Sequence, residues 1–405
     1  MKKLFSSRLL GGILLIVGTT LGVGMLGFPV ALGFGGFFPS VVVFILMGLL
    51  MLSTAFFFLD ANLSIKEESN MVTMAEKLLG KWGKIVCWVI YLLLLYSLTA
   101  VFIAGSTPLL VEAIRWVTGM TLPSWLAPFS LPVLFGGFIY FGTRGVDLVN
   151  RLLMLGLVLS FILLVFFVPS QVEGQNLLHI DFPASWISIP VVITAFGYHI
   201  IIPSLVTYMN RDVRQLRKAL LIGSAIPLFV FLLWQLLVLG AVPLDLLTQA
   251  FIKGEPATVP LAKVLRHPAI SLAAKLFSFF AIVTSFVGVT LSLSDFLTDG
   301  FKIKRTWGGR ILAIFLTFVP PLFFVFTYKR GFYMALQFAG AFVAILLVFL
   351  PAAMAWKLKA YQTVGRRALL IVVMALGLGI VLLDGLQEMG KLNNLISHYI
   401  SKTNV

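Results

Sequence analysis

Glycines and threonines crowd one short segment of a very apolar sequence. Residues 18–29 read GTTLGVGMLGFP, with four glycines, two adjacent threonines and a proline. Glycine is about 1 kcal/mol less favourable than alanine inside a helix, so this composition weakens any helix formed here. A weakened helix exposes backbone N–H and C=O groups, which attract anions and cations respectively. The chemistry that this segment offers is therefore ligand binding by the backbone.

The rest of the sequence is that of a polytopic membrane protein. Of its 405 residues, 60% are hydrophobic and only 11% are charged, about half the charged share of a soluble protein. Apolar runs long enough to cross a hydrocarbon core of about 30 Å recur along the whole chain. We predict eleven spans, at residues 9–36, 38–60, 84–112, 126–142, 147–168, 184–208, 216–242, 269–298, 308–327, 331–356 and 366–388.

The formal net charge of +15 orients the chain in the membrane and requires no nucleic-acid partner. When eleven spans alternate, most of the 30 lysines and arginines fall in connections on one side. Basic residues accumulate on the cytoplasmic side of membrane proteins. We therefore expect a multi-pass protein of the cytoplasmic (inner) membrane, with its N-terminus inside and its C-terminus outside. The connections are short: 61–83 predicts an inner surface helix, and 243–267 predicts one or two helices over the outer mouth.

The first predicted span is longer than a membrane requires. Its roughly 28 residues would make a helix about 42 Å long, and a break at residues 18–24 would remove the excess. Irregular backbone at membrane depth persists only where it lines a cavity or is packed by protein. The alternative is close helix packing through the GxxxG pattern of Gly18 and Gly22, which does not account for the threonines.

The sixth span carries a second interruption. TAFGYHIIIPSL (194–205) places Gly197, His199 and Pro203 at mid-depth, and proline removes a backbone donor. Paired interruptions in corresponding positions of two halves are the best sequence pointer to a transporter binding site. Freed N–H groups attract a carboxylate and freed C=O groups attract an ammonium, so the two breaks suit a zwitterion such as an amino acid.

Three motifs, in order along the chain, carry a resemblance to a known family. GTTLGVGMLGFP, GYHIIIPSL and TSFVGVTLSLSDFLTDGF (284–301) resemble the hydroxy/aromatic amino acid permeases of the amino acid/polyamine/organocation superfamily, and most closely their tyrosine- and tryptophan-specific branch. The resemblance covers essentially the whole chain. It implies an all-α membrane protein of the LeuT type, with two inverted five-helix repeats plus one extra helix. The implied single transmembrane domain spans 1–405, with repeats at 1–168 and 184–356 and the extra helix at 366–388.

The resemblance also implies a secondary active transporter that imports tyrosine and/or tryptophan by proton symport and alternating access. We expect the substrate carboxylate to meet N–H groups around Gly22, Val23 and Gly24, with hydroxyls from Thr19 and Thr20. Further candidates for substrate binding are Tyr96, Phe196, Tyr198, His199 and Gln337.

For two of these candidates, His199 and Tyr96, a purely structural role explains the residue as well as a role in substrate binding does. His199 is the only histidine within a predicted span, and histidine alone titrates near neutral pH when unperturbed. It could contact substrate or proton, or it could stay neutral and hold the break in shape through a hydrogen bond. Tyr96 could reach the substrate carboxylate, or it could pack between helices with its hydroxyl satisfied.

The driving ion stays open between proton and sodium. The eighth span carries Ala281, Thr284 and Ser285, the A-x-x-T-S spacing of sodium-coupled members of this fold, and carbonyls of Gly18 and Leu21 could complete such a site. Alternatively, these small residues let the eighth span pack against the first, with hydroxyls bonded back to carbonyls. We favour proton coupling, with no cofactor and no metal site beyond that sodium alternative.

Charges at the inner ends of two spans suggest a gate. Asp299 could pair with Lys3 or Arg8, by resemblance to gates of this fold. The alternative is that these are solvated charges at helix ends.

Other classes of protein fit less well. An enzyme would need clustered nucleophiles, carboxylates or metal ligands within the spans, whereas the carboxylates here fall at predicted span ends, so we expect no enzyme. A channel would show repeated polar faces or filter-like loops. A sodium-coupled neutral amino acid symporter and a transporter-like amino acid sensor remain as alternatives, although a sensor normally adds a signalling domain.

Overall fold

The computed structural model describes residues 8–22, 24–67, 69–120, 122–123, 125–135, 143–265, 267–304, 306–328 and 330–402. Within these ranges every regular element is a helix, as expected from the sequence. Nine helical stretches there are long and apolar enough to cross a membrane, or ten when the bent pair α2 and α3 is included. The chain is therefore a multi-pass membrane protein. The fourth expected span, 126–142, begins as short helices, and its residues 136–142 lie outside the described ranges.

The helices that build the membrane domain follow the predicted spans closely. They are α2 (Arg8–Thr20), α3 (Gly24–Gly33), α4 (Phe37–Ser64), α5 (Met71–Thr118), α8 (Thr143–Phe167), α10 (Ile189–Ala195), α11 (Ile202–Tyr208), α12 (Val213–Ala241), α15 (Pro268–Gly300), α16 (Trp307–Thr327), α17 (Gly331–Val343), α18 (Leu350–Trp356) and α19 (Val364–Glu388). Short helices join them: η1 (Ala127–Phe129), α6 (Ser130–Phe135), η2 (Val168–Gln171), η3 (Gly174–Leu177), α9 (Phe182–Ser185), η4 (Trp186–Ser188), η5 (Tyr198–Ile201), α13 (Leu244–Lys253), α14 (Thr258–Val264), the π-helical η6 (Ala344–Phe349), η7 (Lys359–Tyr361), η8 (Asn393–Leu395) and α20 (Ser397–Lys402).

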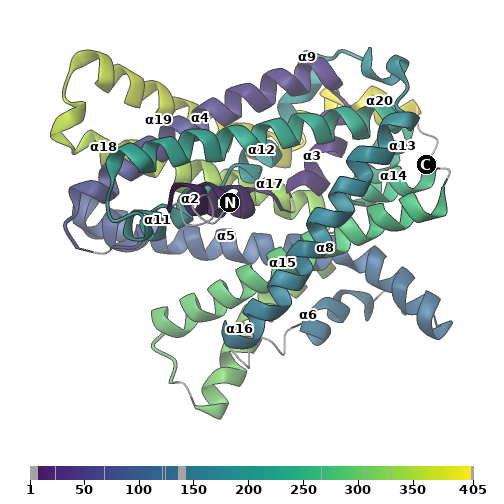
Figure 1. The fold of residues 1–405 in the computed structure, drawn as a ribbon, viewed down its shortest axis with the longest axis horizontal. Helices are drawn as coiled ribbons and strands as arrows, with labels where there is room; N and C mark the ends of the chain where they lie inside the picture. Colours follow the sequence, from purple (N-terminus) through teal and green to yellow (C-terminus); the bar gives the residue numbers. More distant parts are fainter. Residues whose placement is uncertain are drawn as a thin grey trace.

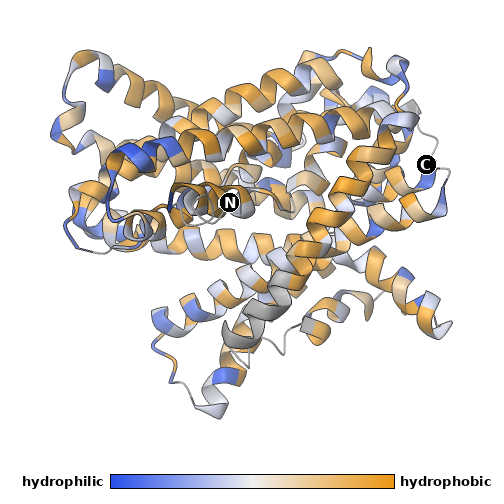
Figure 2. Ribbon diagram, viewed as in Figure 1, coloured by the Kyte–Doolittle hydropathy of each residue, from blue (hydrophilic) through white to orange (hydrophobic). Residues whose placement is uncertain are grey.

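Most of the long helices run side by side, and many of their connections lie at two ends of the molecule (Figure 1). Helices α4, α12, α17 and α5 follow the long axis, α8 crosses them, and α16 and α6 lie beyond α5. Apolar residues cover the helices, and hydrophilic residues concentrate in the connections (Figure 2). One end joins α4 to α5, α11 to α12 and α18 to α19, and we call it the basic end. The opposite end carries α9, α13, α14 and α20.

Both expected helix breaks are present. Helix α2 ends at Thr20 and α3 begins at Gly24, with a bend of 54° between them. Helix α10 ends at Ala195, and helical structure resumes at Tyr198 as the 3-10 turn η5, which continues into α11. The two breaks touch, because a Cβ on Gly24 would lie only 2.7 Å from the Cβ of Ala195. The glycines described at the breaks have no positive φ, so glycine serves close approach here rather than a left-handed backbone.

Prolines inside helices release carbonyls, and side chains from other helices satisfy two of them. Pro29 of α3 cannot donate to the carbonyl of Met25 four residues earlier, and the indole Nε1–H of Trp234 on α12 donates to that oxygen at 2.6 Å. Pro320 of α16 likewise leaves the Leu316 carbonyl without its helical donor. The Tyr96 hydroxyl on α5 donates to the Leu316 oxygen at 3.0 Å. Each bond ties a helix that contains a proline to a neighbouring long helix.

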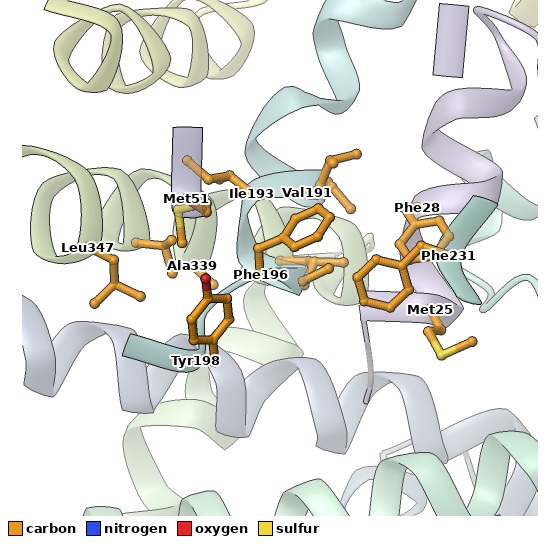
Figure 3. Packing of buried hydrophobic residues seen from close by; sticks show 14 of the residues in the cluster. Met25, Phe28, Met51, Val191, Ile193, Phe196, Tyr198, Phe231, Ala339 and Leu347 are labelled. Carbon is orange, nitrogen blue, oxygen red and sulfur yellow. The ribbon is translucent and has the colours of Figure 1, made fainter. Parts of the chain in front are cut away.

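Aromatic rings fill the space around the first break. Phe28, Phe231 and Phe196 pack edge to face with centroid separations of 5.2 Å for both the 28–231 and 196–231 pairs (Figure 3). Lipid tails are as apolar as these rings, so shape complementarity rather than water exclusion favours the association of helices. Gly340 of α17 illustrates the fit, because a Cβ there would overlap the Pro190 carbonyl of α10.

The predicted connecting helices are also confirmed. In the segment 61–83, residues from Met71 onward form the first part of α5, which is separated from the rest of that helix by a non-helical kink at Gly80, whose φ is 78°. The side chains of Met71 and Met74 are buried. The segment 243–267 forms α13 and α14.

We expect Tyr96→Phe to lower the stability of the protein by about 1 kcal/mol, because it leaves a carbonyl in the membrane without its donor. Pro320→Ala restores the helical N–H for the Leu316 carbonyl, so Tyr96→Phe should lose most of its effect in that background. Thermal unfolding of the four proteins in detergent measures the coupling. Equal effects of Tyr96→Phe in both backgrounds would contradict this role of the hydroxyl.

Candidate ligand-binding site

A cavity of about 360 Å³ lies where the two breaks meet. The broken helices contribute Gly18, Thr19, Thr20, Leu21, Gly22, Gly24, Thr194, Ala195, Gly197 and Ile200 to its wall. The long helices contribute Tyr91, Leu94, Leu95, Leu98, Phe102, Met154, Thr284, Ser285, Gly288, Val289, Ser292, Val343 and Leu347. This volume falls within the range of small-molecule binding pockets, about 300–1,000 Å³.

Backbone groups give the cavity its charge pattern, since none of the described residues lining it carries a charged side chain. Helix α2 ends here at Thr20 and α10 ends here at Ala195, so the partial negative charges of both C-termini point toward the cavity. Helix α3 begins here at Gly24 and offers the partial positive charge of its N-terminus. Within the described part of the chain, the Gly22 amide has no hydrogen-bond partner. The arrangement suits a ligand with one anionic and one cationic group.

The threonine hydroxyls of the first break are already engaged. Thr19 donates to the Leu15 carbonyl at 2.8 Å, and Thr20 donates to the Ile16 carbonyl at 2.7 Å. Both bonds run back along α2, so in this conformation the hydroxyls present lone pairs rather than donors to the cavity. Val23, the remaining residue expected at the carboxylate, lies outside the described residues.

An apolar stripe of α5 forms one wall that the sequence analysis missed. Tyr91, Leu94, Leu98 and Phe102 follow one another at intervals of three or four residues, which places them on one face of the helix. On α15, Ser285, Gly288 and Ser292 share a face in the same way. The helical spacing of these residues is visible in the sequence and predicts that they share a face. It does not predict whether that face lines a cavity or packs against another helix.

Five expected substrate residues lie outside this cavity wall. Tyr96 is engaged with Leu316, and Phe196 packs against Phe231, as described above. Tyr198 is buried with its hydroxyl 2.6 Å from the Ser224 Oγ. Gln337 is buried on α17. The structure thus gives Tyr96 the role of a packed aromatic with a satisfied hydroxyl.

His199 binds the broken helix to α4. Its Nε2 lies 2.9 Å from the Thr54 Oγ1, and Thr54 donates its own proton to the Met51 carbonyl at 3.0 Å. This network assigns the imidazole proton to Nε2. Nδ1 is then a buried lone pair, with no hydrogen-bond partner among the described residues.

The expected ion-coupling residues are close together. Gly18, Leu21, Thr284 and Ser285 all line the cavity, and Ala281 is buried beside them on α15. Thr284 donates back along its helix to the Phe280 carbonyl at 2.8 Å. Ser285 sits against the first break, with its Oγ 3.1 Å from the position of a Cβ on Gly22. The described residues contain no group of three or more His, Cys, Asp or Glu side chains that could hold a metal.

The cavity reaches toward the basic end. Thr19 and Ser292, which line it, are exposed, and its α15 residues belong to the half of that helix nearer the basic end. Arg8 and Asp299 are both exposed, and no ion pair joins them in the described part of the chain. Lys3, the other expected gate residue, lies outside the described residues.

Short helices close the opposite end. Phe34 packs edge-on against Phe251 of α13 with centroids 5.1 Å apart. Between α13 and α14, the Glu255 carbonyl accepts from the Tyr333 hydroxyl at 2.7 Å, and the Ala257 N–H donates to the Leu26 carbonyl at 2.8 Å. These contacts join α3, α17 and the connecting helices into a seal.

The sequence and fold both match known proteins. The family model described as the tryptophan/tyrosine permease family matches residues 5–384. The chain is 33% identical to tyrosine-specific transport system 1 of Haemophilus influenzae over 386 residues, covering 92% of this chain and 95% of that protein. It is 32% identical to the tryptophan-specific transport protein of Pseudomonas aeruginosa over 357 residues, covering 86% and 85% of the two chains.

A crystal structure of a variant of the Eremococcus coleocola manganese transporter shares the fold. The TM-score is 0.59 at 14% sequence identity, with 97% of this chain and 93% of that chain covered. At this identity the likeness concerns architecture alone. It agrees with the LeuT-type fold that the family resemblance implies.

Cysteine labelling should reveal the direction in which the cavity opens. Ser278 and Ser292 lie on one face of α15, but Ser292 lines the cavity and is exposed, whereas Ser278 is fully buried. We expect a membrane-impermeant maleimide to label Ser292→Cys rapidly from the side of the basic end and to leave Ser278→Cys largely unmodified. The native Cys87 is buried, so its background should be low. Labelling of Ser292→Cys from the opposite side alone would contradict the described geometry.

Proposed function

Because this chain belongs to the tryptophan/tyrosine permease family, we propose that it imports an aromatic amino acid, tyrosine and/or tryptophan, across the cytoplasmic membrane. Its family is one of permeases, so the chain is a transporter and not an enzyme, as expected from the sequence. Two of its relatives are named for tyrosine and tryptophan transport.

The observation that best supports this proposal is the pairing of helix ends with an apolar wall in one cavity. A substrate carboxylate would lie at the N-terminus of α3, near the Gly22 amide, and its ammonium at the C-termini of α2 and α10. The aromatic side chain would then face Tyr91, Leu98 and Phe102 of α5. Neutral side chains suit a zwitterion, because a charged lining would favour one of its ends over the other.

Alternating access follows from this proposal and from the seal at the opposite end. With the N-terminus inside, the basic end would be cytoplasmic, and a cavity that reaches toward this end would correspond to an inward-open state. Release of the α13–α14 seal, together with pairing of Asp299 with Arg8, would give the outward-open state. The breaks are natural pivots, because the broken helices can tilt there while α15 and the cavity-lining part of α5 keep their positions.

We favour the proton as the driving ion, with His199 as its acceptor. The Nδ1 lone pair has no partner in the described part of the chain, and Gly197, two residues away, lines the cavity. A buried imidazolium without a counter-charge is costly, so protonation would favour a conformation in which water reaches the second break. Sodium is the second candidate, because Gly18, Leu21, Thr284 and Ser285 bring several oxygen atoms to one place and hard cations prefer oxygen ligands.

Close approach of the two breaks should be essential for uptake. Gly24→Ala places a methyl group 2.7 Å from the Ala195 Cβ, and overpacking of this kind costs about 1–3 kcal/mol. We expect uptake of tyrosine or tryptophan into proteoliposomes to fall by about fivefold to a hundredfold. Ala195→Gly should restore part of it in the double variant. Gly379→Ala on α19, where a Cβ meets open space, is the matched control and should transport normally; equal uptake by all four proteins would contradict the role of Gly24.

Proton coupling predicts uptake driven by an inward pH gradient in sodium-free buffer. The proposed substrate class predicts that, of the twenty amino acids, only the aromatic ones compete for this uptake. His199→Gln should abolish accumulation against a gradient while leaving exchange of internal for external substrate. A strict sodium requirement, increased by Thr284→Ala or Ser285→Ala, would establish sodium in place of the proton.

A further inference from the structure

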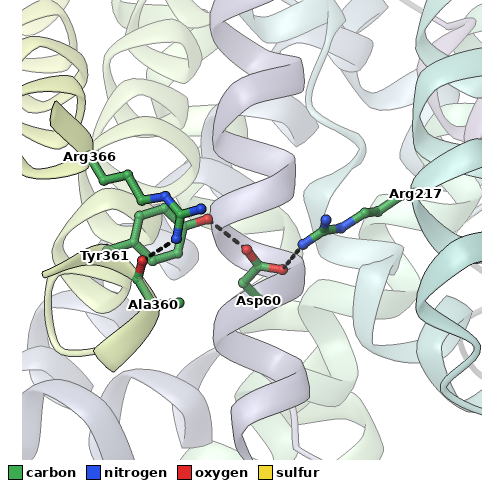
Figure 4. A network of polar contacts seen from close by, with 5 residues as sticks. All are labelled: Asp60, Arg217, Ala360, Tyr361 and Arg366. Carbon is green, nitrogen blue, oxygen red and sulfur yellow. Dashed lines mark hydrogen bonds and ion pairs between the residues drawn. The ribbon is translucent and has the colours of Figure 1, made fainter. Parts of the chain in front are cut away.

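A second cavity, of about 330 Å³, lies at the basic end, far from the two breaks in the sequence. It is formed by α4, α12 and the connection from η7 to α19 (Figure 4). Its lining residues are Phe56, Asp60, Arg217, Ala360, Tyr361 and Arg366. Two arginines and one aspartate therefore meet around one hollow, which gives it a net charge of one positive unit.

Asp60 is fully engaged within this cavity. Its Oδ1 accepts from Arg217 Nη2 at 3.1 Å, and its Oδ2 accepts from the Tyr361 hydroxyl at 2.6 Å. Burial, and then the Asp60 carboxylate, raise the pKa of the Tyr361 phenol above its ordinary value, so the hydroxyl keeps its proton and remains a donor. Both carboxylate oxygens of Asp60 thus accept hydrogen bonds from α12 and η7, and neither forms an ion pair with Arg366.

Arg366 has no carboxylate partner among the described residues. One nitrogen donates to the Ala360 carbonyl, and the guanidinium lies 5.9 Å from the centre of the Tyr361 ring. The sequence contains no aspartate or glutamate from residue 357 to residue 383. Lys357, Lys359 and Arg367 add further positive charge beside the cavity. Most of the donors on this guanidinium are therefore free to meet an anion.

The position of the cavity identifies the kind of anion. Arg366 stands in the first turn of the membrane-spanning α19, at the depth of lipid headgroups. Exposed apolar residues follow it toward the membrane centre, Leu369, Val372 and Leu376 on α19. On α12, the exposed Leu221 lies one turn beyond Arg217. An acyl chain can follow these surfaces while its phosphate stays between the arginines.

We propose that this cavity binds the headgroup of an anionic phospholipid from the leaflet at the basic end. A phosphodiester carries one negative charge, which matches the single uncompensated positive charge of the site, and arginine binds phosphate oxygens through two parallel N–H donors. Lys357 and Lys359 disfavour the cationic group of a zwitterionic lipid. Basic pockets between helices on the cytoplasmic side are a recognised form of lipid site.

The test is thermal unfolding of the full-length protein in neutral detergent, titrated with phosphatidylglycerol or with phosphatidylcholine. We expect phosphatidylglycerol to raise the melting temperature of the wild type, and Arg366→Gln to need about fivefold more lipid for the same shift. Arg367→Gln is the matched control, because its guanidinium lies over the Trp356 ring, 5.0 Å from the centre, outside the cavity wall. Arg366→Lys keeps the charge without the planar fork and should fall between the wild type and Arg366→Gln.

Four outcomes would overturn the proposal. Phosphatidylcholine could stabilise the wild type as strongly as phosphatidylglycerol, or inorganic phosphate could do so, which would mark a site for free anions. Arg366→Gln could respond to phosphatidylglycerol like the wild type. Arg367→Gln could lose the response equally, which would mark a diffuse basic surface. Melting temperatures without added lipid check that each variant is folded. If Arg366→Gln is unfolded, Arg366→Lys is compared with the wild type instead, and an unchanged response of Arg366→Lys to phosphatidylglycerol would then overturn the proposal.

Discussion

The architecture depends on one constraint: a backbone N–H or C=O group inside a membrane must find a partner within the protein. At two of the prolines that release a carbonyl, another helix supplies the donor: Trp234 for the Met25 carbonyl and Tyr96 for the Leu316 carbonyl. The π-helical turn η6 precedes Pro351, which cannot donate to the Leu347 carbonyl. At the cavity the ends of three helix segments converge, and the Gly22 amide has no hydrogen-bond partner among the residues that the structure describes.

The broken helices and the long helices contribute different groups to the cavity. The broken helices supply polar backbone and would pivot in the proposed transport cycle. The long helices α5 and α15 supply a fixed wall of apolar side chains, serines and glycine. Small residues are needed where the two sets meet, as Gly24 against Ala195 shows. Two polar side chains at the second break form hydrogen bonds to neighbouring helices and do not line the cavity. His199 bonds to Thr54 of α4, and Tyr198 bonds to Ser224 of α12.

Charged side chains concentrate in the connections between helices, where water and lipid headgroups can reach them (Figure 2). At the basic end, Asp60 joins α4 to α12 and η7. At the opposite end, the C-terminal α20 folds back over the seal, and Tyr399 donates to Asp181 at 2.8 Å. This last contact could not be predicted from the sequence, because no periodic pattern links a short terminal helix to a residue more than two hundred positions away.

The sequence by itself determined ten of the eleven spans, both breaks and the short helices of 243–267, because hydropathy, glycine and proline act on the local backbone whatever packs around it. The glycines also located the cavity, and Gly22, Gly24, Thr284 and Ser285 do line it. Only the tertiary structure decided which other side chains face inward. Tyr91 lines the cavity and Tyr96 does not, because five residues turn a helix by about 140°. The rotation of α5 about its own axis is set by every helix packed against it, so neither its own sequence nor its composition could choose between the two tyrosines.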